Sequence, residues 1–329
     1  MRLTLCLLLG SLAVPTLKAQ VAPSPLQAQV EAIAAAHHGK VALYAENLQT
    51  RETVAIAPDT PVQTASVIKL AILYEALEQI RAGRIHLDDR ITETPADRVP
   101  GSGILTLLDA PISLTFKDVL TLMIMMSDNA GANLAMDHVG IANVNDRMAK
   151  LGLGNTYLYK KVFTPVAPGT KMPDDQKRFG LGKTTAREMA TLMTKFVKCD
   201  LAEPDHPASP TDQALCDAAL HMLHVQFYRS AIPRYLDGKP GGTGDSIANK
   251  TGSLDAVRND VAAISTKNGM VVISAFTYEN ADHSWGAEHE AELTIAKLAR
   301  VIVEMWSPAG LAPWPKPIGQ VVPPAGVNH

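Results

Sequence analysis

The sequence predicts an α/β (α+β) fold in which an antiparallel sheet, flanked by N- and C-terminal helices, carries an inserted all-helical domain. Two observations predict it: strand-like alternation of apolar residues occurs near both ends of the chain, and helical spacing dominates the middle. Strands from both ends bury their apolar faces best by joining one sheet. We therefore assign residues 20–62 and 230–306 to a split α/β domain and residues 63–229 to a helical domain.

The N-terminal residues have the pattern of an export signal. Arg2 precedes an apolar stretch from Leu3 to Val14, and Ala19 provides a small residue before a cleavage point. The stretch is too short to span a bilayer, and a buried N-terminal helix is the alternative. We expect residues 1–19 to be a signal peptide, the mature protein to be periplasmic or extracellular, and no stable membrane anchor to remain.

The first elements after this signal are a helix and two strands. Apolar spacing predicts the helix over 30–36. Apolar residues at every second position from Val41 predict a half-buried strand over 40–46, and a polar turn separates it from a second strand over 52–57.

The spacing then becomes helical. A helix over 66–82 is bounded by Gly83, a common stop signal. A second helix over 114–126 is apolar around its whole circumference, which predicts deep burial. A third covers 184–197, with Glu188 placed near its start as in a capping box.

Strands return in the last third of the chain. Three are predicted, over 246–251, 260–265 and 270–278, and glycine-bearing turns join them. A closing helix covers 289–305. Residues 307–329 are rich in proline and form a C-terminal tail.

Composition and charge limit the classes of partner that we expect this chain to bind. A formal net charge of −3 over 329 residues gives no reason to expect nucleic acid or an anionic membrane. No group of histidines and cysteines has the spacing of metal ligands, so we expect no metal and no cofactor. The expected partner is a small-molecule substrate, and the expected state is a monomer.

Two cysteines remain in the mature chain. Cys199 and Cys216 bracket an acidic segment that contains proline, and an oxidising compartment would let them form a disulfide across it. Two unpaired buried thiols are the alternative.

The first chemical motif is Ser66-Val67-Ile68-Lys69. A serine at a helix start exposes its hydroxyl, and a lysine one turn later lies on the same helix face. Lys69 can accept the serine proton only when it is neutral, which burial and a second cation would favour. Ser66 is the candidate nucleophile. An N-cap serine followed by a surface lysine is the alternative.

The second motif is Ser127-Asp128-Asn129, at the end of the most apolar helix. Three polar residues beside a core need partners, because an unpaired buried polar group is costly. Ser127 can relay a proton to a leaving nitrogen, Asn129 can hold a substrate amide, and Asp128 can brace the turn. A plain polar helix terminus is the alternative.

The third motif is Lys250-Thr251-Gly252, followed by Ser253, on a predicted strand. The ammonium and hydroxyl groups can grip a carboxylate. Gly252 lets a substrate approach the strand edge. The backbone N–H groups of Ser253 and Ser66 can form an oxyanion hole. An exposed turn is the alternative.

Together the three motifs resemble the class A β-lactamase superfamily, within the serine hydrolases that include penicillin-binding proteins. The resemblance covers nearly the whole mature chain and implies the β-lactamase/transpeptidase-like fold. It gives Ser66, Lys69 and Ser127 catalytic roles. It also implies substrate binding by a further set, which comprises Asn129, Lys250, Thr251, Gly252, Ser253 and, as a second carboxylate clamp, Arg258. A surface salt bridge is the alternative for Arg258. Three further segments match the family, namely Leu87 to Ile91, Thr115 to Asn133 and Thr184 to Ala190.

One departure bears on mechanism. The family carries a Glu-x-x-Leu-Asn string whose glutamate activates the water that releases the acyl-enzyme. The corresponding stretch here, residues 156–163, has no glutamate, and Asp174 and Asp175 are the carboxylates between Arg147 and Arg187. Either aspartate, or Lys69 itself, could replace it. The segment from 199 to 216 is an insertion relative to compact members of the family.

Three functions fit these features. The first is an exported serine hydrolase that opens the β-lactam amide through an acyl-enzyme, with slow release of the acyl group as a variant. The second is a D-alanyl-D-alanine carboxypeptidase or penicillin-binding enzyme that acts on peptidoglycan peptides. The third is a non-catalytic binding module that retains the fold, which the intact Ser66, Lys69 and Ser127 argue against.

Overall fold

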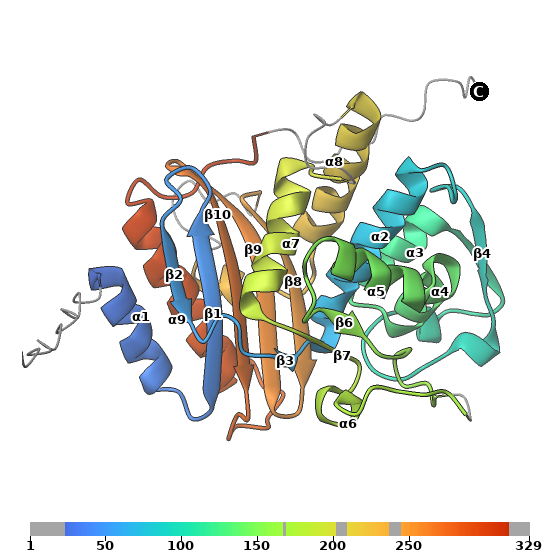
Figure 1. Ribbon diagram of the computed structural model, residues 1–329, viewed down its shortest axis with the longest axis horizontal. Coiled ribbons are helices and arrows are strands. Elements are labelled where there is room, and N and C mark those ends of the chain that lie inside the picture. The colour runs from blue at the N-terminus through green and yellow to red at the C-terminus, as the bar shows by residue number, and fades with distance from the viewer. Residues whose placement is uncertain (1–23, 167–168, 202–208, 237–244, 316–329) are drawn as a thin grey trace, which may run out of the picture.

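A computed structural model describes residues 24–166, 169–201, 209–236 and 245–315. Its centre is a five-stranded antiparallel sheet in the order β2-β1-β10-β9-β8 (Figure 1). Strand β1 pairs with β10 from the C-terminal part, for example Lys40 with Tyr278, and β2 pairs with the outer side of β1. The predicted sheet built from both ends of the chain is therefore confirmed. Its strands are β1 (Lys40–Asn47), β2 (Thr53–Ile56), β8 (Ile247–Leu254), β9 (Val257–Thr266) and β10 (Gly269–Tyr278).

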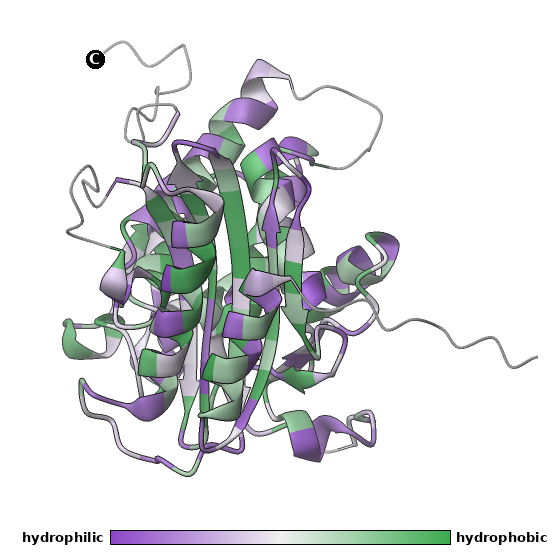
Figure 2. Cartoon of the chain, turned by 90° about the vertical axis from the view of Figure 1, so that its left-hand side faces the viewer, coloured by the Kyte–Doolittle hydropathy of each residue, from purple (hydrophilic) through white to green (hydrophobic). Residues whose placement is uncertain are grey.

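Two terminal helices cover one face of this sheet. Helices α1 (Pro25–Ala35) and α9 (Glu290–Trp306) lie together on that side in Figure 1. Their apolar residues form a buried core with the sheet, to which Val30, Ile273 and Ile295 belong. Figure 2 looks from this side and shows the hydrophobic colour concentrated in the strands and on the inward helix surfaces.

Helices from the middle of the chain cover the other face and extend beyond the sheet. The central one is α2 (Lys69–Arg81), whose residues 69–79 are all buried. Around it the chain forms a second core with Phe116, Phe196 and Leu223. The other helices of this group are α3 (Phe116–Met125), α4 (Asn129–Val139), α5 (Ile141–Lys150), α6 (Gln176–Phe179), α7 (Ala186–Lys198) and α8 (Pro210–His224).

Short elements connect these layers. Two small sheets pair β4 (Arg90–Glu93) with β5 (Ile112–Thr115), and β7 (Gly182–Thr184) with both β3 (Val62–Gln63) and β6 (Tyr157–Leu158). Single 3₁₀ turns are η1 (Ala65–Ile68), η2 (Pro95–Asp97), η3 (Leu105–Leu107) and η4 (Ile232–Tyr235).

Several element boundaries differ from the predicted ones. The helix predicted from residue 66 begins as the 3₁₀ turn η1 and becomes α-helical only at Lys69. The helix predicted from 184 begins at Ala186, because Thr184 pairs with Val62 in a sheet and Thr185 is the N-cap that accepts from Glu188 N. Strand β9 begins three residues earlier than predicted. Its first residues include Arg258 and Asn259, which are polar but buried, so the apolar pattern did not mark them as part of a strand.

A disulfide joins Cys199, at the end of α7, to Cys216 in α8. The bond ties together two helices of the second core and settles the alternative between a bridge and free thiols. The predicted signal peptide and the tail from residue 316 onward lie outside the described residues. Within the described residues, no helix has the length and apolar character needed to cross a membrane.

Candidate active site

Ser66 lies on a strained turn between strand β3 and helix α2. The residue before it, Ala65, has a φ of 44°, in the left-handed region that residues other than glycine rarely occupy. Strand β8 approaches the same turn closely: a Cβ atom on Gly252 would lie 2.9 Å from Ser66 N and 2.8 Å from Thr64 O. The glycine therefore permits backbone-to-backbone contact between β8 and the turn that carries Ser66.

Lys69 is fully buried at the start of α2. Its Nζ donates to the Ser127 carbonyl at 2.7 Å, to Ser127 Oγ at 3.2 Å and to Asn129 Oδ1 at 3.0 Å. Burial, followed by repulsion from Lys250, lowers the pKa of Lys69 well below its usual value, and the charge of Asp128 opposes the shift only in part. Its amine is thus biased toward the neutral form that can accept a proton. Within the described residues, no hydrogen bond joins it to the Ser66 hydroxyl.

Lys250 reaches Ser127 from the sheet side. Its Nζ donates to Ser127 Oγ at 3.0 Å and to the Thr251 carbonyl at 2.8 Å. Burial lowers the pKa of Lys250 to about 7, against the opposing attraction of Asp260. Burial also raises the pKa of Asp260 to about 6, although Asn249 and the Ile232 N–H stabilise its charge. The Ser127 hydroxyl therefore lies between two amines that both titrate below the usual lysine range.

The turn from α3 to α4 positions Ser127 through Asp128. Ser127 itself adopts a left-handed φ of 52°. Asp128 caps α4 by accepting from Gly131 N at 2.9 Å, and its other oxygen accepts from Ile104 N at 2.7 Å and Leu105 N at 2.9 Å. As expected, Asp128 braces the turn, and it does so by holding a loop from a distant part of the chain.

Asn129 faces the same loop. Its Nδ2 donates to the Pro100 carbonyl at 3.0 Å, while its Oδ1 accepts from Lys69. The aromatic ring of Phe163 lies nearby, since a Cβ on Gly101 would be 2.6 Å from Asn129 Nδ2 and 3.2 Å from Phe163 Cε2. The Phe163 side chain is exposed. The loop therefore leaves Asn129 beside an exposed aromatic residue.

Two further asparagines, not found by the sequence analysis, hold backbone segments of the site. Asn259 Nδ2, on β9, donates to the Gln63 carbonyl at 2.9 Å and to the Thr64 carbonyl at 3.1 Å, just before Ser66. Asn133, one turn after Asn129 on α4, accepts from Val162 N at 2.8 Å and donates to Val162 O at 3.0 Å. No local sequence signal marks either residue, because each acts on a segment distant along the chain.

The two aspartates that could replace the family's glutamate are either exposed or engaged by other residues. Asp175 accepts from Lys183 Nζ at 2.7 Å and from the Tyr159 hydroxyl at 2.7 Å. These two bonds, that from Lys183 first, lower the pKa of Asp175, which makes it a weaker base. Asp174 is exposed on the surface.

Arg258 lies near the third motif with its side chain almost wholly buried. Together with Thr251 and Ser253 it lines a pocket at the side of strand β8. Its guanidinium donates to the Val257 carbonyl at 2.9 Å and to the Ser284 carbonyl at 2.8 Å, and to the Leu254 carbonyl as well. Arg258 therefore shares a pocket with Thr251, and much of its hydrogen-bonding capacity is already used; its role as a second carboxylate clamp stays a prediction.

Known proteins share this architecture. The model of the beta-lactamase enzyme family matches residues 25–306. A β-lactamase from Bacillus licheniformis is 25% identical over 240 residues, which cover 72% of this chain and 70% of that protein. The crystal structure of a β-lactamase from Sphaerobacter thermophilus is 30% identical, covers 87% of this chain and 98% of its own, and superposes with a TM-score of 0.71. A PBP-A mutant, solved as an acyl-enzyme complex with penicillin-G, is 24% identical, with coverage of 85% and 95% and a TM-score of 0.69, and so shows the fold alone.

Proposed function

The chain belongs to the beta-lactamase enzyme family and is a serine β-lactamase-like hydrolase, and we propose that it is exported and opens β-lactams through an acyl-enzyme on Ser66. The observation that carries the proposal is the convergence of Lys69 and Lys250 on Ser127 Oγ, beside the turn that holds Ser66. The expected export rests on the N-terminal pattern, and the division at residues 63 and 229 remains our proposal for the domains.

In the acylation step, neutral Lys69 takes the proton of Ser66 Oγ while that oxygen attacks the lactam carbonyl. The N–H groups of Ser66 and Ser253 stabilise the resulting oxyanion. The ring nitrogen then leaves as the C–N bond breaks, and Ser127 Oγ protonates it. The ammonium of Lys69, which now holds the proton taken from Ser66, returns it to Ser127 Oγ. The Ser66 proton therefore ends on the ring nitrogen, and Lys69 is neutral again.

Substrate binding follows from the same groups. Lys250 and the Thr251 hydroxyl would hold the substrate carboxylate, with Arg258 as a second cation, and Asn129 would hold the side-chain amide. Gly252 would leave room for the substrate at the edge of β8, because that strand has a single sheet neighbour among the described strands.

Release of the acyl group is proposed to be slow. A positioned general base contributes about 10²–10⁴ in rate. Asp175 is bound to Lys183 and Tyr159, and Asp128 is buried against three backbone N–H groups, which leaves neither carboxylate available to activate water. Lys69 is the remaining candidate of those expected from the sequence, apart from the exposed Asp174.

The engagement of Asp175 and Asp128, which makes slow acyl release the expectation, also favours a second candidate function. A D-alanyl-D-alanine carboxypeptidase or other penicillin-binding enzyme would use the same residues on a cell-wall peptide. The place of β8 at the end of the strand order suits an extended peptide, which can add to a sheet as a further strand. A non-catalytic module would have no use for the paired amines at Ser127.

One experiment separates these functions. Mature protein is mixed with a chromogenic cephalosporin, and colour and intact mass are followed together. Steady colour formation supports the hydrolase, and a single-turnover burst with a persistent adduct supports the penicillin-binding enzyme. A folded protein without any adduct supports the binding module. Ser66→Ala should abolish colour and adduct, and their persistence would exclude Ser66 as the nucleophile.

A further inference from the structure

The pocket beside Thr251 contains a carboxylate as well as a cation. Glu292, near the start of α9, lines it with Arg258, Thr251 and Ser253. Glu292 Oε1 lies 3.5 Å from Arg258 Nε, and the side chain is only 18% exposed. The pocket expected to hold an anionic group of the substrate therefore already has a negative charge in its wall.

The remaining donors of Arg258 are mostly committed. A guanidinium has five N–H groups, and two from one planar edge are needed to grip a carboxylate in a bidentate manner. The backbone carbonyls of Leu254, Val257 and Ser284 take donors from both terminal nitrogens. The Nε side, which would supply one half of a bidentate grip, is the side that Glu292 approaches.

An aromatic ring restricts the guanidinium further. The ring of Trp285 lies 4.4 Å from the central carbon of the Arg258 guanidinium, within the range of a cation–π contact. Trp285 is itself 66% exposed, so it covers the arginine from the solvent side. With carbonyls at its edge and a ring on its face, Arg258 cannot turn away from Glu292 without losing several contacts.

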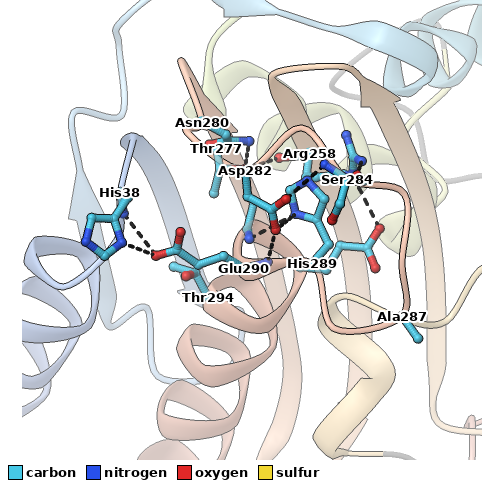
Figure 3. Close-up of polar contacts among 12 residues, drawn as sticks. His38, Arg258, Thr277, Asn280, Asp282, Ser284, Ala287, His289, Glu290 and Thr294 are labelled. Atoms are coloured by element: carbon cyan, nitrogen blue, oxygen red, sulfur yellow. Dashed lines mark hydrogen bonds and ion pairs between the residues drawn. The ribbon is translucent and has the colours of Figure 1, made fainter.

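The loop that supplies these contacts is braced from both ends (Figure 3). Asp282 accepts from Ser284 N and from Glu290 N, each at 2.9 Å. Glu290 in turn accepts from the backbone and ring nitrogens of His38. The Ser284 carbonyl is therefore held in place, and so is the first turn of α9 that carries Glu292.

We propose that Glu292 is a specificity-determining residue that acts as an internal competitor for Arg258. Its carboxylate occupies the arginine edge and reduces the positive charge offered to the substrate carboxylate. Acylation should then depend less on that carboxylate than the cations alone would suggest, and substrates with a masked or missing carboxylate should be better tolerated. The inference rests on the proposed function and identifies the substrate carboxylate as the group that this pocket recognises.

The test compares benzylpenicillin with its methyl ester, which lacks the negative charge. In Glu292→Gln, the second-order rate constant of acylation by benzylpenicillin should rise about 5- to 30-fold, as expected for removing one close charge at a partly desolvated site. The rate constant for the ester should change less than about twofold by the same argument. Glu288→Gln is the matched control. It also removes one negative charge, from the adjoining loop, but the Glu288 carboxylate forms its ion pair with Arg234. It should leave both rates unchanged.

Binding measured without chemistry separates this inference from the proposed function. In a Ser66→Ala background, NMR titration gives the dissociation constants of both compounds with and without Glu292→Gln. A tighter complex with benzylpenicillin alone supports the role of Glu292, even if the wild-type chain forms no adduct. Equal gains for acid and ester, a loss for the acid, or no carboxylate-dependent binding in either variant would overturn it.

Discussion

Gly252→Ala should separate the sheet from the turn that carries Ser66. An ideal Cβ at this position would lie 2.8 Å from Thr64 O, 2.9 Å from Ser66 N and 3.0 Å from Val67 N. Ordinary van der Waals contact begins at 3.4 Å, so the closest approach is short by about 0.6 Å. All three atoms belong to the backbone, and no side-chain rotation can relieve the overlap.

The magnitude follows from that displacement. Either β8 or the turn must move by several tenths of an ångström, and overpacking of this kind destabilises a protein by about 1–3 kcal/mol. Misplacement of reacting groups by about 1 Å costs about 10²-fold in rate, so we expect a 10- to 100-fold loss of acylation. Stopped-flow acylation by a chromogenic cephalosporin gives the rate, and urea unfolding gives the stability.

A matched substitution tests whether any added methyl group has this effect. Gly154 is exposed, and a Cβ there meets no heavy atom within 4 Å. Gly154→Ala should therefore keep both the acylation rate and the urea midpoint. If Gly252→Ala has a normal urea midpoint and an acylation rate within threefold of wild type, then β8 does not approach the Ser66 turn this closely.

Three other predictions concern the two amines and the disulfide. Because burial lowers the pKa of Lys250 to about 7, its charge is lost as pH rises through 7. Acylation by carboxylate-bearing substrates should then fall, and Lys250→Arg should remove this limb of the pH profile because arginine stays protonated; an unchanged limb near pH 7 would contradict the assignment. Lys69→Met should lower the rate of adduct formation, followed by intact mass, by about 10²–10⁴, and adduct formation at the wild-type rate would exclude Lys69 as the base. Replacing Cys199 and Cys216 together by alanine should lower the free energy of unfolding by about 3 kcal/mol, from the length of the loop they close. Urea titration checks this, with the oxidised wild type as reference, and an unchanged midpoint would show that the bridge adds no stability.

The buried cations also make stability depend on pH. The pKa of Lys250 is lowered from 10.5 to about 7, so between these values the unfolded chain binds more protons than the folded one. The folded state should consequently gain stability from this residue as pH rises from 7 toward 10.5. Below pH 7 the lysine is charged in both states, and the full cost of burying its charge remains.

The three motifs could be predicted because each is local and chemically distinctive. The fold class followed from the contrast between alternating and helical spacing, which the sheet and the two cores bear out. Boundaries were predicted less well where one residue serves two roles. Thr184 fits a helix start by sequence, but its backbone pairs with Val62 in a strand.

The residues that position the site could not be predicted, because their roles depend on contacts between segments that are far apart in the sequence. Asn259 and Gln63 are 196 positions apart, and single-sequence patterns carry no information on such pairs. Arg258 is polar yet buried in a strand that is buried throughout, so the expected alternation is absent there. Glu292 follows ordinary helix spacing, and its place in the pocket emerges only when α9 is set beside β9.

The position of β8 at the margin of the five-stranded sheet has a consequence for inhibitor discovery. A ligand that lies along this margin would be recognised mainly through its main chain, so quite different side chains could be accommodated. If both proposed activities use this strand, a bicyclic lactam and a linear D-peptide would compete for it and differ chiefly in how long the ester persists. Peptidomimetics with an extended main chain and an electrophilic boron or phosphorus centre should accordingly inhibit both of the proposed activities.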